Sequence, residues 1–314
     1  MSSTTRLRCA ALLAGAMLST PALAEDASCA TVRFSDVGWT DITATTAATT
    51  VVLEALGYET DVKVLSVPVT YASLKNGDID VFLGNWMPTM EADIAPYRAD
   101  GSVLTVRANL DGAKYTLAVP RYTFEAGLKS FGDIARFKDQ LDGKIYGIEP
   151  GNDGNRLILD MIANDTFGLK GFDVVESSEQ GMLAQVARMV KKKDHIVFLG
   201  WEPHPMNANF EMAYLAGGDD VFGPNYGGAT VYTNVRAGYL EACPNVGKLL
   251  SNLAFSLAME NEIMGAILND GMEPRAAAKA WLAKHPGMLD GWLDGVATRD
   301  GGAGLGAVRT KLGL

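Results

Sequence analysis

Short apolar runs alternate with longer helical runs over the first third of the chain. The runs TVRFSD, TDVKVLSVP and IDVFLGNW are predicted strands, because they are short, rich in β-branched and aromatic residues and bounded by turn residues. Between them, DITATTAATTVVLEALGY and TYASLKNGD are predicted helices that end at Gly57 and Gly77, and Asp41 is a candidate N-cap of the first. This β-α-β-α-β order predicts a parallel sheet with helices on its faces.

The same alternation returns in the middle of the chain. Helices are predicted at 131–143, 155–168 and 178–193, and strands at 144–150, 172–177 and 195–201. After about residue 240 the pattern is mostly helical, in PNVGKLLSNLAFSLA, ENEIMGAILNDG and EPRAAAKAWLAKH. The chain therefore reads as two α/β units followed by a helical tail.

The first 24 residues have the pattern of an export signal. A positive start is followed by the apolar run CAALLAGAML and by ALA, a small-x-small cleavage site. The run is too short to span a bilayer. We expect residues 1–24 to be removed and the mature, exported protein to begin at Glu25. It then keeps two of its three cysteines, Cys29 and Cys243. An even pair in an exported protein predicts a disulfide, with two free thiols as the alternative.

A bond between Cys29 and Cys243 would tie the helical tail to the first unit. Lobe I would then be discontinuous, comprising 25–115 plus 220–314, and lobe II, 116–219, would be inserted into it. The two crossings, near 114–116 and 230–233, would act as hinge segments that let the lobes close on a ligand.

Aromatic residues stand where such a fold binds its ligands, at the carboxyl ends of the strands. Trp39 follows the first strand, and Trp86 and Trp201 end the third strand of each unit, both within FLG-x-W-like sequences. Tyr115 lies at the first crossing. Core packing is the ordinary explanation for any one of these rings, but all four at one cleft predict a box for a poorly hydrated cation.

Charge and motifs narrow the function further. The formal net charge is −10, and loss of Arg6 and Arg8 with the signal makes it −12. This argues against nucleic acid or an anionic membrane surface as a partner. The three histidines, His195, His204 and His285, lack metal-ligand spacing. No nucleotide-binding loop or nucleophile motif is present, so we expect neither a cofactor nor a metal.

Four segments carry a resemblance to a known family: DVGWTD at 36–41, LKNGDIDVFLGNWMPT at 74–89, GIEPGNDGN at 147–155 and FLGWEPHPMN at 198–207. Over nearly the whole mature chain, the sequence resembles the periplasmic substrate-binding proteins of ABC importers for quaternary amines, and most of all their choline-binding branch. The resemblance implies the α/β, two-lobed, type II periplasmic binding-protein fold, with the ligand in the inter-lobe cleft. It also implies an aromatic box of Trp39, Trp86, Tyr115 and Trp201.

The resemblance further implies that Asp41 and Asn152 bind the rest of choline. Asp41 would accept the choline hydroxyl proton or act as a counter-charge, whereas it would repel the carboxylate of glycine betaine. The alternatives are an N-cap role for Asp41 and a turn role for Asn152. Asp36, Asp153 and Glu202 are treated as supporting or surface residues.

These observations predict a monomeric periplasmic protein, not an enzyme, that binds choline or a related quaternary amine. It would deliver the ligand to an inner-membrane permease with a cytoplasmic ATPase. The first alternative is a glycine betaine or proline betaine binder of the same class. The second is an extracellular enzyme acting on choline esters.

Overall fold

The computed structural model describes residues 27–314, and the predicted signal segment 1–24 lies outside them. The strands are β1 (Thr31–Asp36), β2 (Glu59–Val64), β3 (Val81–Met87), β4 (Val103–Pro120), β5 (Lys144–Tyr146), β6 (Asp173–Val175), β7 (Phe198–Glu202), β8 (Met212–Tyr214) and β9 (Gly228–Arg236).

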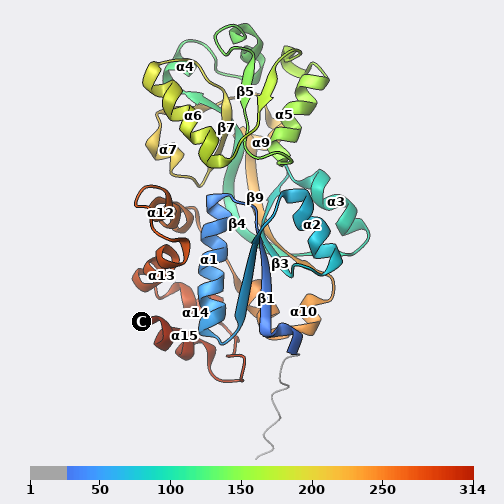
Figure 1. The fold of residues 1–314 in the computed structure, drawn as a ribbon, viewed down its shortest axis with the longest axis vertical. Coiled ribbons are helices and arrows are strands. Elements are labelled where there is room, and N and C mark those ends of the chain that lie inside the picture. The colour runs from blue at the N-terminus through green and yellow to red at the C-terminus, as the bar shows by residue number, and fades with distance from the viewer. Residues whose placement is uncertain (1–26) are drawn as a thin grey trace, which may run out of the picture.

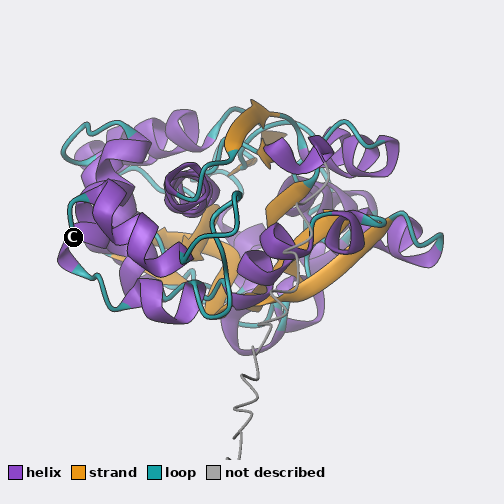
Figure 2. Ribbon diagram, turned by 90° about the horizontal axis from the view of Figure 1, so that it is seen from below, coloured by secondary structure: helices purple, strands orange, loops and turns teal. Residues whose placement is uncertain are grey.

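Helices surround these strands on their outer sides (Figure 2). The α-helices are α1 (Thr40–Ala55), α2 (Val67–Asn76), α3 (Glu91–Ala99), α4 (Arg121–Glu125), α5 (Asp153–Ala163), α6 (Glu179–Lys192), α7 (Met206–Asn209), α8 (Asp219–Phe222), α9 (Pro224–Gly227), α10 (Tyr239–Ala242), α11 (Pro244–Asn252), α12 (Leu257–Leu268), α13 (Pro274–Lys284), α14 (Met288–Trp292) and α15 (Gly304–Leu312). The 3₁₀ helices are η1 (Ala27–Ala30), η2 (Phe131–Phe137) and η3 (Thr166–Gly168).

The molecule has two lobes, as the sequence predicted (Figure 1). Lobe I, at the bottom of Figure 1, holds β1–β3, α1–α3 and the C-terminal helices, and lobe II, at the top, holds β5–β7 and α4–α7. The long strands β4 and β9 run between them. The boundaries 25–115, 116–219 and 220–314 remain a prediction.

One mixed sheet passes through both lobes, in the order β2-β1-β3-β9-β4-β7-β5-β6, with β8 paired to β4. Pairing is parallel within each lobe, β2-β1-β3 and β7-β5-β6, and antiparallel where β4 and β9 join them. The expected parallel α/β units are therefore present. The antiparallel centre was not predicted.

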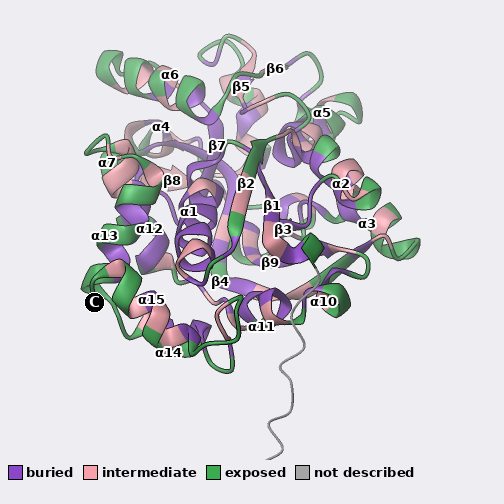
Figure 3. Ribbon diagram, turned by 60° about the horizontal axis from the view of Figure 1, so that its bottom comes forward, coloured by how far each residue is buried: buried purple, intermediate pink, exposed green. Residues whose placement is uncertain are grey.

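Helix α1 is buried in lobe I although it is rich in threonine (Figure 3). Several hydroxyls donate to carbonyls one turn earlier in the helix, such as Thr49 Oγ1 to the Thr45 oxygen at 2.8 Å. This local bonding satisfies the hydroxyls of Thr45, Thr49 and Thr50 without water, so the helix can be covered by α12 and α13. The arrangement directs the start of α1, with Trp39 and Asp41, toward lobe II.

The predicted helix at 131–143 was wrong in its second half. Phe131–Phe137 form the 3₁₀ helix η2, with Ser130 and Asp133 making a capping box. Asp142 and Gly143 adopt φ values of 53° and 61°, in the left-handed region that ends a helix rather than continuing it.

None of the helices described between residues 27 and 314 has both the length and the apolar character of a membrane span.

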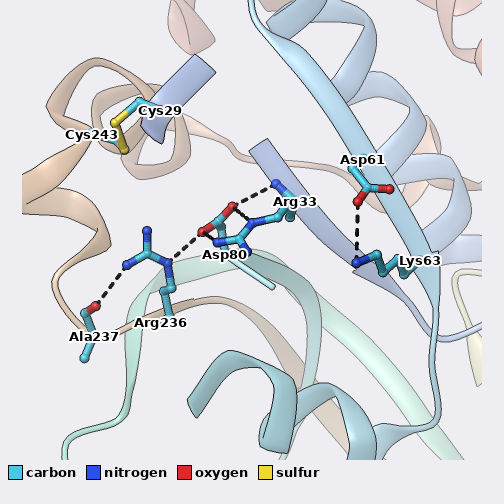
Figure 4. A network of polar contacts seen from close by, with 8 residues as sticks. All are labelled: Cys29, Arg33, Asp61, Lys63, Asp80, Arg236, Ala237 and Cys243. Carbon is cyan, nitrogen blue, oxygen red and sulfur yellow. Dashed lines mark hydrogen bonds and ion pairs between the residues drawn. A yellow bond between two sulfur atoms is a disulfide. The ribbon is translucent and has the colours of Figure 1, made fainter. Parts of the chain in front are cut away.

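A disulfide and an ion-pair network join the first strand to the C-terminal part of the chain (Figure 4). The disulfide joins Cys29 to Cys243, as predicted. Beside it, the buried Asp80 accepts bonds from Arg33 Nη2 at 2.7 Å and from Arg236 Nε at 2.7 Å. Burial disfavours the charged form, but the two arginines hold the pKa of Asp80 below its ordinary value.

Replacing Asp80 with asparagine is expected to lower the free energy of unfolding by about 2–3 kcal/mol at pH 7, because it leaves two guanidinium groups without their counter-charge. Urea unfolding followed by circular dichroism measures this. Asp61→Asn is the control, since Asp61 and Lys63 form an exposed 3.6 Å pair that contributes below about 1 kcal/mol. Because the folded-state pKa of Asp80 is lowered, its stabilisation is present above the ordinary value and is lost as pH falls. Equal losses in the two variants would contradict the prediction.

Candidate functional site

A cavity between the lobes is lined by the four predicted aromatic residues. Its lining residues are Trp39, Asp41, Trp86, Tyr115, Ile148, Asp153 and Trp201. The structure therefore brings together five of the six predicted ligand residues, and Asp153 lines the cavity beside the sixth, Asn152.

Three of the rings form a continuous aromatic wall. The Tyr115 ring contacts Trp86 edge-on, with centroids 6.1 Å apart, and Trp201 in the same way at 6.2 Å. Tyr115 and Trp201 are direct partners on β4 and β7, and Trp86 lies on β3. The indole N–H of Trp39 donates to Glu149 Oε1 at 2.8 Å, and that of Trp86 to Asp41 Oδ2 at 3.1 Å. These bonds hold the polar edges of two of the three indole rings that line the cavity.

The two FLG-x-W-like sequences share one backbone feature. Each tryptophan lies one residue before an X-Pro bond in the cis form, Met87–Pro88 in one lobe and Glu202–Pro203 in the other. The glycine two residues before Trp86 has no room for a side chain, because a Cβ on Gly84 would lie 2.7 Å from Ile42 Cδ1. The repeated motif thus supplies one indole ring from each lobe.

Asp41 is fully buried and has one unused oxygen. Oδ1 has no hydrogen-bond partner, although the carboxyl is only 1% exposed. Burial, with the nearby charge of Glu179, raises the pKa of Asp41 to about 8. The proposed N-cap role is wrong, because the N-cap of α1 is Trp39 and Asp41 lies within the first turn.

Asn152 joins the aromatic wall to the start of α5. Its Oδ1 accepts from the Tyr115 hydroxyl at 2.9 Å and from Asn155 N at 3.1 Å, as the N-cap of α5. Its amide donates to Asp153 Oδ1 at 3.0 Å. Gly154 makes the approach of Tyr115 possible, because a Cβ there would lie 2.1 Å from the phenol oxygen. Direct contact of Asn152 with a ligand stays a prediction.

Asp153 was expected to be a supporting or surface residue, but it lines the cavity, as does Ile148, which was not predicted. Asp153 has no exposed surface, and its Oδ2 has no hydrogen-bond partner. Burial raises the pKa of Asp153 to about 6, opposed by the nearby Thr89 hydroxyl. The available signal was its position one residue after Asn152, at the start of a helix, which brings both side chains to the same end of α5.

Three carboxyl groups gather in this region, because Glu149 lies behind Trp39 in addition to Asp41 and Asp153. Burial raises the pKa of Glu149 to about 7, and the charges of Asp153 and Glu179 add to this. Within residues 27–314, no group of histidine, cysteine and acidic side chains is arranged to hold a metal ion. Aromatic faces with two unpartnered carboxylate oxygens suit an organic cation that carries one hydrogen-bond donor.

Residues 30–284 match the family described as the substrate binding domain of ABC-type glycine betaine transport systems. An ABC-transporter choline binding protein solved with choline is 75% identical, with a TM-score of 0.91, and the match covers 92% of this chain and 100% of that one. An ABC-transporter choline binding protein in an unliganded semi-closed conformation is 76% identical, with a TM-score of 0.85. That match covers 91% of this chain and 100% of the other. Lactococcal OpuAC, closed around glycine betaine, is 26% identical with a TM-score of 0.76, over 83% of this chain and 98% of its own.

Proposed function

Because the chain belongs to the family of substrate-binding domains of ABC-type glycine betaine transport systems, we propose that it binds choline and delivers it to an ABC importer. The observation that carries this proposal is the cavity itself. Aromatic rings surround a space whose lining also includes two buried carboxyl groups, Asp41 and Asp153, each with one oxygen that has no hydrogen-bond partner.

The chemistry of choline fits both parts of this cavity. A trimethylammonium group has no N–H to donate, so ring faces suit it, and each desolvated ring contributes about 2 kcal/mol. Micromolar affinity corresponds to about −8 kcal/mol, which three or four such rings approach. The single hydroxyl of choline can donate to Asp41, and both carboxylates balance its charge.

Glycine betaine is the second candidate ligand, favoured by the description of the family and by the betaine complex of lactococcal OpuAC. Its carboxylate would enter a cavity that already holds two buried acids, which electrostatics opposes.

Membership of a transport family argues against the alternative of an extracellular enzyme that acts on choline esters. The partners are the membrane permease and ATPase of an ABC system. Residence in the periplasm, after removal of residues 1–24, completes the proposal.

Calorimetric titration tests the choice of ligand. The protein is expressed from Glu25, unfolded and refolded to remove bound ligand, and titrated separately with choline and glycine betaine. Micromolar choline affinity with much weaker betaine affinity is expected. Tight betaine binding without choline binding would overturn the assignment of Asp41, and binding of neither would mean that the aromatic residues serve the core.

Closure of the empty protein is expected to depend on pH. Burial in the closed form raises the pKa of Asp41 to about 8 and that of Asp153 to about 6, whereas solvated carboxyls titrate near pH 4. A raised pKa favours the closed form when the groups are protonated, so this contribution is lost as pH rises from about 4 to 8. A bound cation offsets the free-energy cost of burying the two charged carboxylates in the closed form.

Small-angle scattering from pH 4.5 to 8 checks this expectation. Without choline, the closed fraction should fall as pH rises, and with saturating choline it should stay high. The same pH profile in both samples would count against a counter-charge role for the two acids.

A further inference from the structure

A glutamate of lobe II bonds to the first turn of a lobe I helix. Glu179, the first residue of α6, is buried. Its Oε2 accepts from the backbone N of Thr40 at 2.8 Å, and its Oε1 from the Thr40 hydroxyl at 2.5 Å. Thr40 is the first residue of α1 and stands between Trp39 and Asp41, two residues that line the cavity.

Helix α1 has no cap from residues near it in the sequence. Its N-cap residue is Trp39, which makes no side-chain capping bond. The first N–H groups of a helix need acceptors, and the positive end of the helix dipole favours a carboxylate there. Glu179 supplies that acceptor from the other lobe. Other caps seen in the chain are local, such as Ser178 for α6 and Ser256 for α12.

The other side of Glu179 is held by a residue that packs on the aromatic wall. His204 Nδ1 accepts from the Met206 backbone N at 2.9 Å. The proton of a neutral His204 therefore lies on Nε2, which donates to Glu179 Oε1 at 3.1 Å. The His204 ring also packs against Trp201, with centroids 4.9 Å apart. One chain of contacts thus runs from Trp201 in lobe II to the start of α1 in lobe I.

We propose that Glu179 is a positioning residue that couples lobe closure to ligand retention, by capping α1 only when the lobes meet. The proposal rests on the proposed function. Opening the cleft separates Glu179 from Thr40, so the N–H of Thr40 must find water instead. Closure restores the cap and fixes Trp39 and Asp41 against the ligand.

This contact differs from other polar bridges between the lobes. The Trp39–Glu149 bond and the Arg156–Asp93 pair, at 2.8 and 2.7 Å, involve partly exposed groups that water can replace. The side chain of Glu179 has no exposed surface, so its bonds have no such substitute in the closed form. Its negative charge also contributes, after burial, to the raised pKa of Asp41.

Stopped-flow tryptophan fluorescence with choline tests the role of Glu179. A charge-assisted bond that forms after encounter should act on dissociation. Glu179→Gln is therefore expected to raise the dissociation rate about 10- to 100-fold, with the association rate changed less than about threefold. Scattering at saturating choline should show a smaller closed fraction. Glu125→Gln, on an exposed position of α4, is the charge-matched control and should behave as wild type.

Thr40→Val gives an independent test, because it removes the hydroxyl that donates to Glu179 Oε1 and keeps the backbone N–H that donates to Oε2. Its dissociation rate should rise in the same direction by a smaller factor, and the double variant should dissociate no faster than about twice the rate of Glu179→Gln. If Glu179→Gln does not fold, Thr40→Val alone carries the test.

Wild-type dissociation in a folded Glu179→Gln variant would overturn the proposal, as would a slower association with unchanged dissociation. Unchanged dissociation in Thr40→Val, where it alone carries the test, would overturn it equally. In each of these cases choline binding by the wild type would still stand. Failure of the wild-type protein to bind choline would instead overturn the proposed function.

Discussion

Replacing Trp86 with alanine is expected to weaken choline binding at least 100-fold. The substitution removes one desolvated ring face, at about 2 kcal/mol. It also removes the edge contact with Tyr115 and the N–H bond to Asp41 Oδ2. The buried Asp41 then loses the one side-chain N–H that donates to it, which adds to the loss.

Calorimetry of Trp86→Ala and Trp86→Phe measures this effect. Phenylalanine keeps a ring face and should retain most of the affinity, with a loss of about tenfold. Trp281→Phe is the control, because Trp281 packs on His285 in the C-terminal helices, away from the cavity. Equal affinities of wild type and Trp86→Ala would mean that Trp86 is an ordinary core residue.

Replacing Asp41 with asparagine is expected to separate choline from glycine betaine. The variant loses a buried counter-charge and a charged acceptor for the choline hydroxyl, a loss of about 10- to 100-fold in choline affinity. Glycine betaine affinity should stay the same or rise, because a repulsive charge is removed. Competition between the two ligands, followed by calorimetry, measures the ratio.

Two further variants sharpen this test. Asp153→Asn should also weaken choline binding if the second unpartnered carboxylate acts on the cation. Asp61→Asn removes an exposed acid of β2 and should leave both affinities unchanged. A parallel loss for both ligands in Asp41→Asn would indicate a structural role for Asp41 rather than recognition of charge.

Much of the site could be read from local sequence because its signals are local. A short apolar strand that ends in a tryptophan and then a proline places Trp86 and Trp201 at strand ends whatever the rest of the chain does. Trp39 follows from the strand TVRFSD and the helix after it in the same way. The two-lobed fold follows from the repeated strand–helix alternation and from the cysteine pair.

The central strands were missed because their stabilising partners are distant. Strand β4 contains Gly112 and the polar stretch RANLDGAK, so its alternation is weak. It is held by pairing with β9, where Leu104 lies opposite Val235 across more than a hundred residues of chain. Non-local pairing of this kind overrides local strand preference.

The sequence by itself determined the aromatic side chains, the acidic neighbours and the alternation that makes two lobes, since each depends on residues near in the chain. Only the tertiary structure decided which acids matter. Asp153 and Glu179 both read as ordinary acids in the first turn of a helix. One becomes a cavity carboxylate and the other a cap for α1, because burial and hydrogen-bond partners are properties of the assembled lobes rather than of a residue and its sequence neighbours.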